Sequence, residues 1–221
     1  MCEKPMLFSV EEYEEAFALA KEYDVLLMEA LKSVFLPSVM EVKKMVKEKQ
    51  IGEILSVSAS FMRNGHHPTD HWIFDPHCGG AFKDLGSYCI GTLNYILDKD
   101  PKLISLESDR RETMAETSAL AILDYDGIEG KVSVSNSVDG DHKLSLIGER
   151  GFIEIEDFWK QGHIVYQIDG LSYEKQIDLI SDFYYELKHF SKLVNRGLKS
   201  SDVMSFEASE NIIRMTQEIG V

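Results

Sequence analysis

Apolar side chains recur along this chain with two different periods, and each period predicts a different kind of backbone. In the first thirty residues the period is helical. The apolar positions are Tyr13, Ala16, Phe17 and Ala20. Ser9 and Glu12 precede them with the S-x-x-E spacing of a capping box, in which each side chain caps the backbone amide of the other. These positions predict a helix, and the apolar run at 25–30 predicts a short buried strand after it.

The period changes from helical to alternating at residue 55. Before that point a second helix is expected to begin near Pro37, because proline fits the first turn of a helix, and to end near Gly52. From residue 55 to 61 apolar residues alternate with serines, which predicts a half-buried strand with one small, polar face. Residues 62–79 are irregular, and a further helix is expected from about 80 to 97.

Residues 103–176 have the pattern of a run of antiparallel strands. The clearest strands are expected at 119–125, 131–135, 143–147, 152–155 and 164–168. The turns between them are expected at Asp126-Gly127, Asp139-Gly140, 148–151 and Asp169-Gly170, and Asp-Gly is a strong hairpin signal. Two helices, at about 178–196 and 203–219, close the chain. The fold class is therefore α+β: a large, mostly antiparallel sheet flanked by helices, after a short helix and strand.

The composition excludes several classes of function. The 221 residues are 44% hydrophobic and 28% charged, which excludes a disordered, collagen-like or coiled-coil chain. The net charge of −15 repels phosphate backbones, and no basic patch offsets it, so we expect no nucleic-acid partner. No stretch approaches the ~18 apolar residues of a membrane-spanning helix, so we expect no membrane partner.

Three cysteines bear on the cellular compartment. Cys2, Cys78 and Cys89 are an odd number at spacings that do not suggest a disulfide framework. The first residues have no apolar core behind a basic region, so they do not read as a secretory signal. Both features favour a reducing cytoplasm.

Asp84 and Tyr88 are the first candidates for chemistry. They lie four residues apart on an expected helix, so they project from one face. A carboxylate and a phenol stacked in this way could bind a hydroxylated substrate and move its proton. The ordinary alternative is a surface aspartate and a half-buried tyrosine, which is the commoner case on burial preferences alone. Glycines at 79, 80, 86 and 91 favour a functional site over this alternative, because glycine inside a helix usually marks the close approach of another group to the backbone.

Lys4 lies in the tripeptide Glu3-Lys4-Pro5, ahead of the capped helix. An isolated lysine is more often a surface charge. This one lies just after the expected end of a parallel strand, and α/β sheets build their sites at such ends.

Four histidines and a cysteine crowd the irregular segment and raise the question of a metal. They are His66, His67, His71, His77 and Cys78. Gly65 and Pro68 oppose a helix that would present two histidines to one ion, and no paired C-x-x-C or H-E-x-x-H motif accompanies them. We therefore predict a loop that lines a pocket and no metal site. A G-x-G-x-x-G motif is also absent from the sequence.

The order of these motifs resembles the Gfo/Idh/MocA family of NAD(P)-dependent oxidoreductases. The resemblance is carried by Glu3-Lys4-Pro5, by the segments 27–30 and 51–54, by the segment 79–88 and by the closing helices. It implies that residues 1–32 are a remnant of a Rossmann dinucleotide-binding domain. Residues 33–221 would be the substrate and oligomerisation domain.

The resemblance also implies roles for individual residues. Lys4 would be catalytic and lie by the nicotinamide of NAD or NADP, with Glu3 and Pro5 beside it in the cofactor-binding tripeptide. Asp84 would be the substrate-binding acid. Tyr88 would be the catalytic residue of the tyrosine-type branch, which includes glucose–fructose oxidoreductase and dimeric dihydrodiol dehydrogenase.

These roles are chemically compatible with the removal of hydride from a CH–OH carbon. Removing hydride from a CH–OH carbon requires a base for the hydroxyl proton, and a phenol with an ordinary pKa near 10 is a poor one. We expect the Lys4 ammonium to lower the pKa of Tyr88. The hydride acceptor has to be a cofactor, because no side chain performs this reaction.

Two hypotheses about function follow. The first is an NAD(P)-dependent oxidoreductase that acts on a hydroxyl-bearing carbon of a sugar, polyol or diol. The second is a catalytically inactive remnant that serves as a dimerisation or small-molecule-binding module. The absent glycine-rich turn favours the second, and the retained candidate residues favour the first. Under either hypothesis this chain alone is expected to bind NAD or NADP weakly. A homo-oligomer through the sheet is also expected, because the few helices cannot cover both faces of so many strands.

Overall fold

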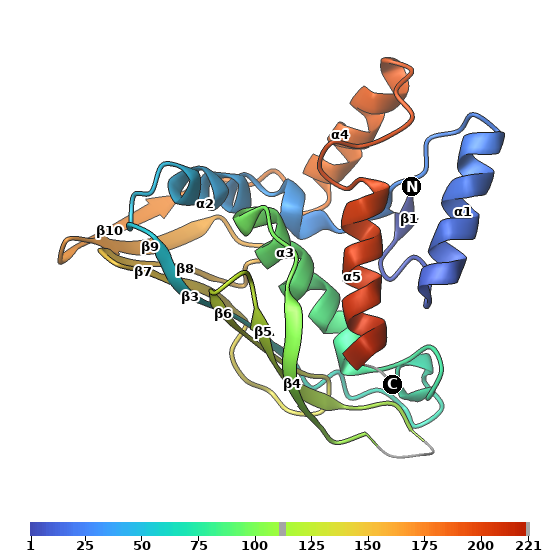
Figure 1. Cartoon of the computed structure of the whole chain (residues 1–221), viewed down its shortest axis with the longest axis horizontal. Coiled ribbons are helices and arrows are strands. Elements are labelled where there is room, and N and C mark those ends of the chain that lie inside the picture. The colour runs from blue at the N-terminus through green and yellow to red at the C-terminus, as the bar shows by residue number, and fades with distance from the viewer. Residues whose placement is uncertain (111–113, 220–221) are drawn as a thin grey trace.

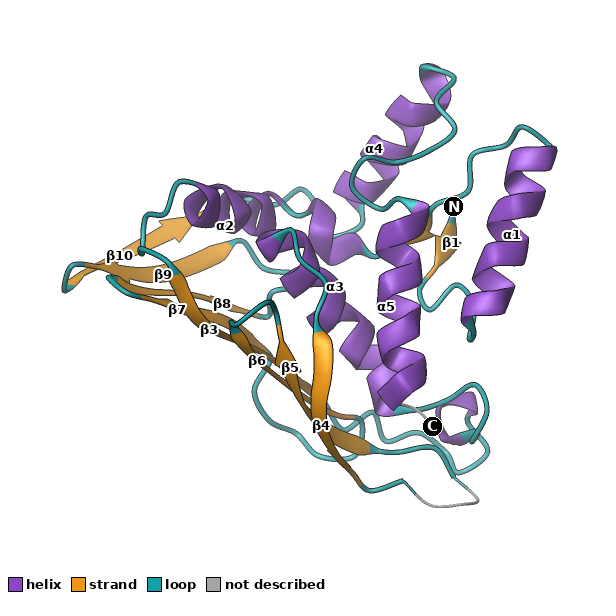
Figure 2. Ribbon diagram, in the orientation of Figure 1, coloured by secondary structure: helices purple, strands orange, loops and turns teal. Residues whose placement is uncertain are grey.

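The structure is a computed structural model that describes residues 1–110 and 114–219. Its largest part is an eight-stranded sheet with the helices gathered over one face (Figures 1 and 2). The strand order is β10-β9-β8-β7-β3-β6-β5-β4. The strands are β3 (Ile54–Met62), β4 (Lys102–Ser108), β5 (Ser118–Asp124), β6 (Glu129–Ser135), β7 (Lys143–Gly148), β8 (Gly151–Glu156), β9 (His163–Ile168) and β10 (Leu171–Gln176). The predicted α+β fold class is confirmed.

Strand β3 lies inside the sheet and joins its two halves. It pairs in parallel with β6 on one side and antiparallel with β7 on the other, whereas the remaining pairs of the described sheet are antiparallel. Because β3 separates β6 from β7, the turn expected at Asp139-Gly140 does not close a hairpin, and that prediction is wrong. A local turn motif cannot indicate that β3, which comes from a distant part of the sequence, lies between two successive strands.

The other two Asp-Gly turns do close hairpins. Asp126-Gly127 joins β5 to β6, and Asp169-Gly170 joins β9 to β10. All four residues have positive φ, from 50° to 90°, as a two-residue type I′ turn requires. The turn expected at 148–151 likewise joins β7 to β8.

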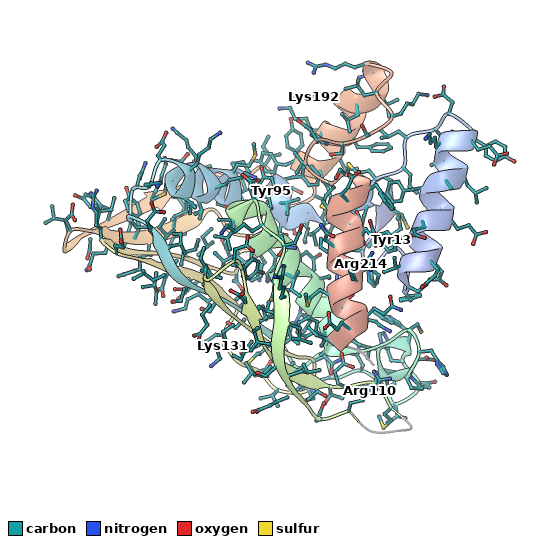
Figure 3. The ribbon with its side chains drawn as sticks, in the orientation of Figure 1. Tyr13, Tyr95, Arg110, Lys131, Lys192 and Arg214 are labelled. Carbon is teal, nitrogen blue, oxygen red and sulfur yellow. The ribbon has the colours of Figure 1, made fainter. Side chains whose placement is uncertain are left out.

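The two faces of the sheet have different surroundings. Helices α2 (Pro37–Lys47) and α3 (Ser87–Leu97) lie over one face, and α5 (Phe206–Ile219) packs on α3 (Figure 1). Apolar residues of β3 such as Phe61 are buried beneath them. Lys131 of β6 projects from the opposite face, which carries none of the helices among the described residues (Figure 3). None of the described helices is both long enough and apolar enough to cross a membrane.

A small parallel pair begins the chain. Strand β1 (Cys2–Glu3) pairs with β2 (Glu29–Ala30), and α1 (Val10–Glu22) connects them. The strand expected at 25–30 is thus confined to its last two residues, and Val25 is 52% exposed. Strand β1 ends at Glu3, so Lys4 lies just after a parallel strand, as its position in the sequence suggests.

The N-terminal cap of α1 is close to the predicted one. The Ser9 hydroxyl accepts from the amide of Glu12 at 3.2 Å. The Glu12 carboxylate accepts from the amide of Phe8, at 2.9 Å, rather than from that of Ser9. Buried Tyr13 of α1 points toward α5 and donates to Glu29 of β2 (Figure 3). Its bond ties the helix to the parallel pair.

The helix expected from about 80 to 97 consists of two parts. A π-helical turn, Phe82–Gly86, leads directly into α3. Gly80 precedes it with a φ of +120°, and a Cβ there would collide with the carboxylate of Glu116. That carboxylate accepts from the amide of Phe82 at 3.0 Å and so caps the turn. Gly80 is therefore needed for the close approach that sets the direction of this helix.

Candidate active site

Lys4, Asp84 and Tyr88, which the sequence singles out, meet in the structure. The Lys4 ammonium lies 2.7 Å from Oδ1 of Asp84 and also donates to the backbone carbonyl of Asp84. It lies over the Tyr88 ring, 4.4 Å from the ring centroid, in cation–π geometry. The Lys4 side chain is only 7% exposed, so these contacts replace most of its water.

Three elements position these side chains. Lys4 follows β1 and is joined to Pro5 by a cis peptide bond. Asp84 belongs to the π-helical turn and Tyr88 to the first turn of α3. Because one ammonium touches both residues, they lie on a common side of the helix, as their spacing predicts. Phe61 of β3 packs against Tyr88, with 5.9 Å between ring centroids.

The pKa of Tyr88 is raised, which is the opposite of the expected effect of Lys4. Burial of the phenol is the largest cause, followed by the negative charges of Glu3 and Asp84. Lys4 lies over the face of the ring, and its charge is already paired with Asp84. The surrounding carboxylates therefore outweigh it, and the phenol is held neutral at neutral pH.

Glu3 and Pro5 flank Lys4. Glu3 is exposed, and its negative charge raises the pKa of Tyr88 and of Glu186. Glu3 is therefore close enough to the site to act on it electrostatically, although its carboxylate is accessible to solvent.

A second group of side chains borders Tyr88, and the sequence analysis did not predict that its members meet. We call it the Lys32 cluster. Its members are Lys32, Trp159, Asp182, Phe183 and Glu186. The Lys32 ammonium forms an ion pair with Asp182 and lies 4.8 Å from the Trp159 ring and 4.0 Å from the Phe183 ring. The sequence gives two partial signals: Lys32 lies in the largely apolar stretch 25–36, and Asp182, Phe183 and Glu186 belong to the closing segment that resembles the family.

The start of the fourth helix explains how Asp182 reaches Lys32. The helix α4 (Tyr184–Asn195) begins at Tyr184 rather than near 178, so Asp182 and Phe183 precede its first turn. Glu186 lies within that turn, with 2% of its surface exposed. The pKa of its carboxyl is raised to about 7, first by burial and then by the negative charge of Glu3, while Lys32 opposes the shift.

The start of α1 is the position at which the pyrophosphate of a dinucleotide would be tested against this chain. A pyrophosphate needs free backbone amides at a helix N-terminus. At the start of α1, the amide of Val10 donates to Gln217 and the amide of Glu12 donates to Ser9. Glu11 and Glu12 add negative charge to that turn. The start of α1 therefore does not fit a pyrophosphate.

The histidine-rich segment forms no metal site among residues 1–110 and 114–219, where no group of three His, Cys, Asp or Glu side chains is arranged to hold an ion. The rings of His67 and His71 instead stack, with 4.2 Å between centroids. His71 caps the short helix Trp72–Phe74 by accepting from the amide of Ile73.

Known proteins resemble this chain in sequence over nearly its whole length. Residues 39–154, slightly more than half of the chain, match the GFO/IDH/MocA C-terminal domain. The chain is 27% identical to the trans-1,2-dihydrobenzene-1,2-diol dehydrogenase of Bos taurus and 28% identical to that of Mus musculus. Both alignments cover 99% of this chain and 68% of the relative.

Solved structures show the same fold. The chain superposes on an aldose-aldose oxidoreductase from Caulobacter crescentus, complexed with glycerol, with a TM-score of 0.88 at 19% identity. It superposes on a 3-ketoreductase from Actinomadura kijaniata, in complex with NADP and TDP-benzene, with a TM-score of 0.88 at 21% identity. These alignments cover 99% and 98% of this chain and 68% of each of those chains.

The raised pKa of Glu186 predicts a pH-dependent stability. Because the pKa is about 7 in the folded chain and 4.5 ordinarily, the folded state keeps a proton that the unfolded chain releases in this window. The free energy of unfolding should therefore fall as pH rises from about 4.5 to 7. Glu186→Gln should remove that loss and melt roughly 2–10 °C higher relative to the parent at pH 8 than at pH 5.

The control is Glu15→Gln, which alters an exposed carboxylate on α1. Thermal unfolding followed by circular dichroism at both pH values measures the effect. A difference between parent and Glu186→Gln that does not change with pH would contradict the assignment of a shifted carboxyl to this position.

Proposed function

Because the chain belongs to the GFO/IDH/MocA family, we propose that it is the substrate-binding and catalytic part of an NAD(P)-dependent oxidoreductase. The reaction would transfer hydride to or from a hydroxyl-bearing carbon of a sugar, polyol or diol. The family and the relatives are oxidoreductases, and one solved neighbour is in complex with NADP. The observation that carries the proposal is the convergence of Lys4, Asp84 and Tyr88.

The proposal gives each of these residues a role. Tyr88 exchanges a proton with the substrate oxygen on the reacting carbon. Since burial and nearby acids favour the neutral phenol, Tyr88 is set to donate that proton to a carbonyl oxygen as it is reduced. Asp84 accepts a hydrogen bond from a second substrate hydroxyl and orients the carbon. Lys4 holds the Asp84 carboxylate and the Tyr88 ring in place.

NAD or NADP would supply the hydride chemistry. Under this proposal Glu3, Lys4 and Pro5 lie at its reacting end. Residues 1–32 then form the part of the chain that faces the cofactor, and residues 33–221 form the substrate and oligomerisation domain. Cys2, Cys78 and Cys89 are all free, which supports the further proposal of a cytoplasmic location.

Tyr88→Phe is the direct test of the catalytic assignment. The test uses a chimera in which the Bos taurus relative supplies the third of its length that this chain does not cover. We expect the parent chimera to form or consume NADPH or NADH with sugars, polyols or diols. We expect Tyr88→Phe to depress turnover by about 10² to 10⁴, the usual scale for the loss of an acid–base group.

Tyr95→Phe is the matched control for this substitution. Tyr95 lies on the same helix and also has a lysine over its ring, Lys43 at 4.0 Å. Its loss should leave turnover unchanged. Equal turnover of the two variants would rule Tyr88 out, and a folded but inactive parent chimera would favour the non-catalytic module.

The affinity of this chain for a dinucleotide is open to direct measurement. The 221-residue chain alone should bind NAD(H) and NADP(H) weakly, because its sequence has no glycine-rich turn, the start of α1 is capped, and its net charge of −15 repels an anionic ligand. Calorimetric titration of each dinucleotide measures this. A dissociation constant in the low micromolar range would refute the prediction and point to a cofactor site elsewhere in the chain.

We also predict a homodimer or higher homo-oligomer through the sheet. The face of the sheet without helices exposes apolar side chains, and Ile147 of β7 is 49% exposed there. Light scattering at micromolar concentration should give at least twice the monomer mass, and Ile147→Lys should lower it by placing a charge in the interface. Ile180→Lys, at a 70% exposed position outside the strands, is the control. A monomer mass for the parent chain would contradict this prediction.

A further inference from the structure

Glu29 of β2 is a buried acid to which the proposed reaction gives no role. Only 3% of its surface is exposed. Its Oε1 accepts from the backbone amide of Met6 at 3.0 Å and from the hydroxyl of Tyr13 on α1. Tyr13 points toward α5, which carries the buried Ser209 (Figure 3). One carboxyl thus joins the parallel pair to the first helix and to the segment that precedes this helix.

The surroundings of this carboxyl are not those of a packing residue. Oε2 of Glu29 and the hydroxyl of Ser209 have no hydrogen-bond partner within the described residues. Burial raises the pKa of Glu29, whereas the bonds from Tyr13 and Met6, the Ser209 hydroxyl and the charge of Lys4 lower it. Lys4 is therefore close enough to act on this carboxyl electrostatically. Apolar groups of the same shape can replace buried hydrogen-bonding groups at little cost, so packing alone does not explain an acid here.

The backbone around Lys4 has few bonds that could fix it. Strand β1 ends at Glu3, and its pairing with β2 covers two residues of each strand. Pro5 has no amide hydrogen to donate. The amide of Met6 is therefore the first donor after Lys4, and it donates to Glu29. Because Met6 lies two residues from Lys4, this bond fixes the direction in which the chain leaves the lysine.

We propose that Glu29 is the positioning residue for Lys4. Its Oε1 holds the amide of Met6, and this bond sets the backbone so that the Lys4 ammonium reaches Asp84 and lies over the Tyr88 ring. Without the acceptor, the segment between β1 and α1 loses this restraint and Lys4 leaves both contacts. The inference rests on the proposed function, because it names the residue that holds one member of the proposed site.

Two substitutions separate the reach of the Glu29 side chain from its charge. Glu29→Gln keeps an acceptor oxygen at the same distance from the backbone and removes the charge, and its amide can donate to the Ser209 hydroxyl. Glu29→Asp keeps the charge but withdraws both oxygens by one methylene. If reach positions Lys4, the Gln variant should behave like the parent and the Asp variant should not.

Amine labelling of the 221-residue chain measures the position of Lys4 without any cofactor. Acetic anhydride acylates neutral amines, and mass spectrometry gives the rate at each lysine. Lys4 of the parent should react slowly, because its side chain is 7% exposed and its ammonium is paired with Asp84. Glu29→Asp should raise this rate about tenfold, the scale of one lost hydrogen bond to a charged group, and Glu29→Gln should leave it within about twofold. Glu29→Met, which removes the acceptor and the charge together, gives a second measurement with the expectation of the Asp variant.

Lys32 and Tyr13 supply the controls. The Lys32 side chain is 6% exposed and also pairs with an aspartate, so its labelling reports general loosening and should not change. Tyr13→Phe removes the other bond to the same Glu29 oxygen and leaves the one from Met6, so Lys4 should react at the parent rate. Near-ultraviolet circular dichroism establishes that each variant is folded. In the active chimera, Glu29→Asp should lower turnover at least about tenfold, whereas Glu29→Gln should not.

The positioning role is refuted if Lys4 of the folded Asp and Met variants is labelled at the parent rate, or if Lys32 labelling rises by the same factor. It is also refuted if Glu29→Gln or Tyr13→Phe exposes Lys4 as Glu29→Asp does. These outcomes differ from failure of the proposed function. Lys4 labelling that depends on Glu29, in a chain whose active chimera shows no role for Tyr88, would refute only the catalytic assignment. Turnover that depends on Tyr88, with Lys4 labelling insensitive to Glu29→Asp, would refute only the positioning role.

Discussion

The contact of Lys4 with Asp84 and Tyr88 joins the two parts of the molecule. Lys4 follows the first strand of the small parallel pair, whereas Asp84 and Tyr88 belong to the helix on the large sheet. Removing an ammonium from water is costly unless its charge and its protons are matched by partners. Here a carboxylate, a backbone carbonyl and an aromatic face match them. The start of the chain is therefore held in one position against α3, and the geometry of the site depends on that position.

Burial gives this region its electrostatic character. Two lysines and several acids are brought close together, and each lysine is paired with one aspartate. The remaining acids have no cation of their own. Their fields disfavour further negative charge, which is why the Tyr88 phenol and the Glu186 carboxyl both hold their protons more tightly than usual. The protonation of the site is thus a property of the whole group of charges rather than of one residue.

Local pattern was sufficient to predict much of this fold. The cap at Ser9, the two Asp-Gly hairpins and the alternation in β3 depend on interactions between near neighbours, and the structure contains all of them. The convergence of Lys4 with Asp84 was expected from the resemblance of short motifs to a known family. Their contact spans 80 positions of the sequence, and no local period could have indicated it.

The features that sequence reasoning missed share one physical cause. The Lys32 contact with Asp182 spans 150 positions, and the insertion of β3 between β6 and β7 is a pairing between distant segments. The direction of the Tyr88 pKa shift depends on burial and on acids from several elements. Such quantities are set by packing in three dimensions, so the sequence could mark Lys32 and the closing segment that contains Asp182 separately but could not show that they meet.

The central place of β3 has a consequence for how the chain reaches its native state. Its partners begin at residues 129 and 143, so both edges of this strand stay open until much of the remaining sequence has been synthesised. Closing loops of this length makes folding slow, because the entropy of closure is lost before the new contacts form. During that interval an alternating apolar strand with two free edges is a template for aggregation. The serines of β3 reduce this hazard, since they leave one of its faces small and polar while the strand waits for its neighbours.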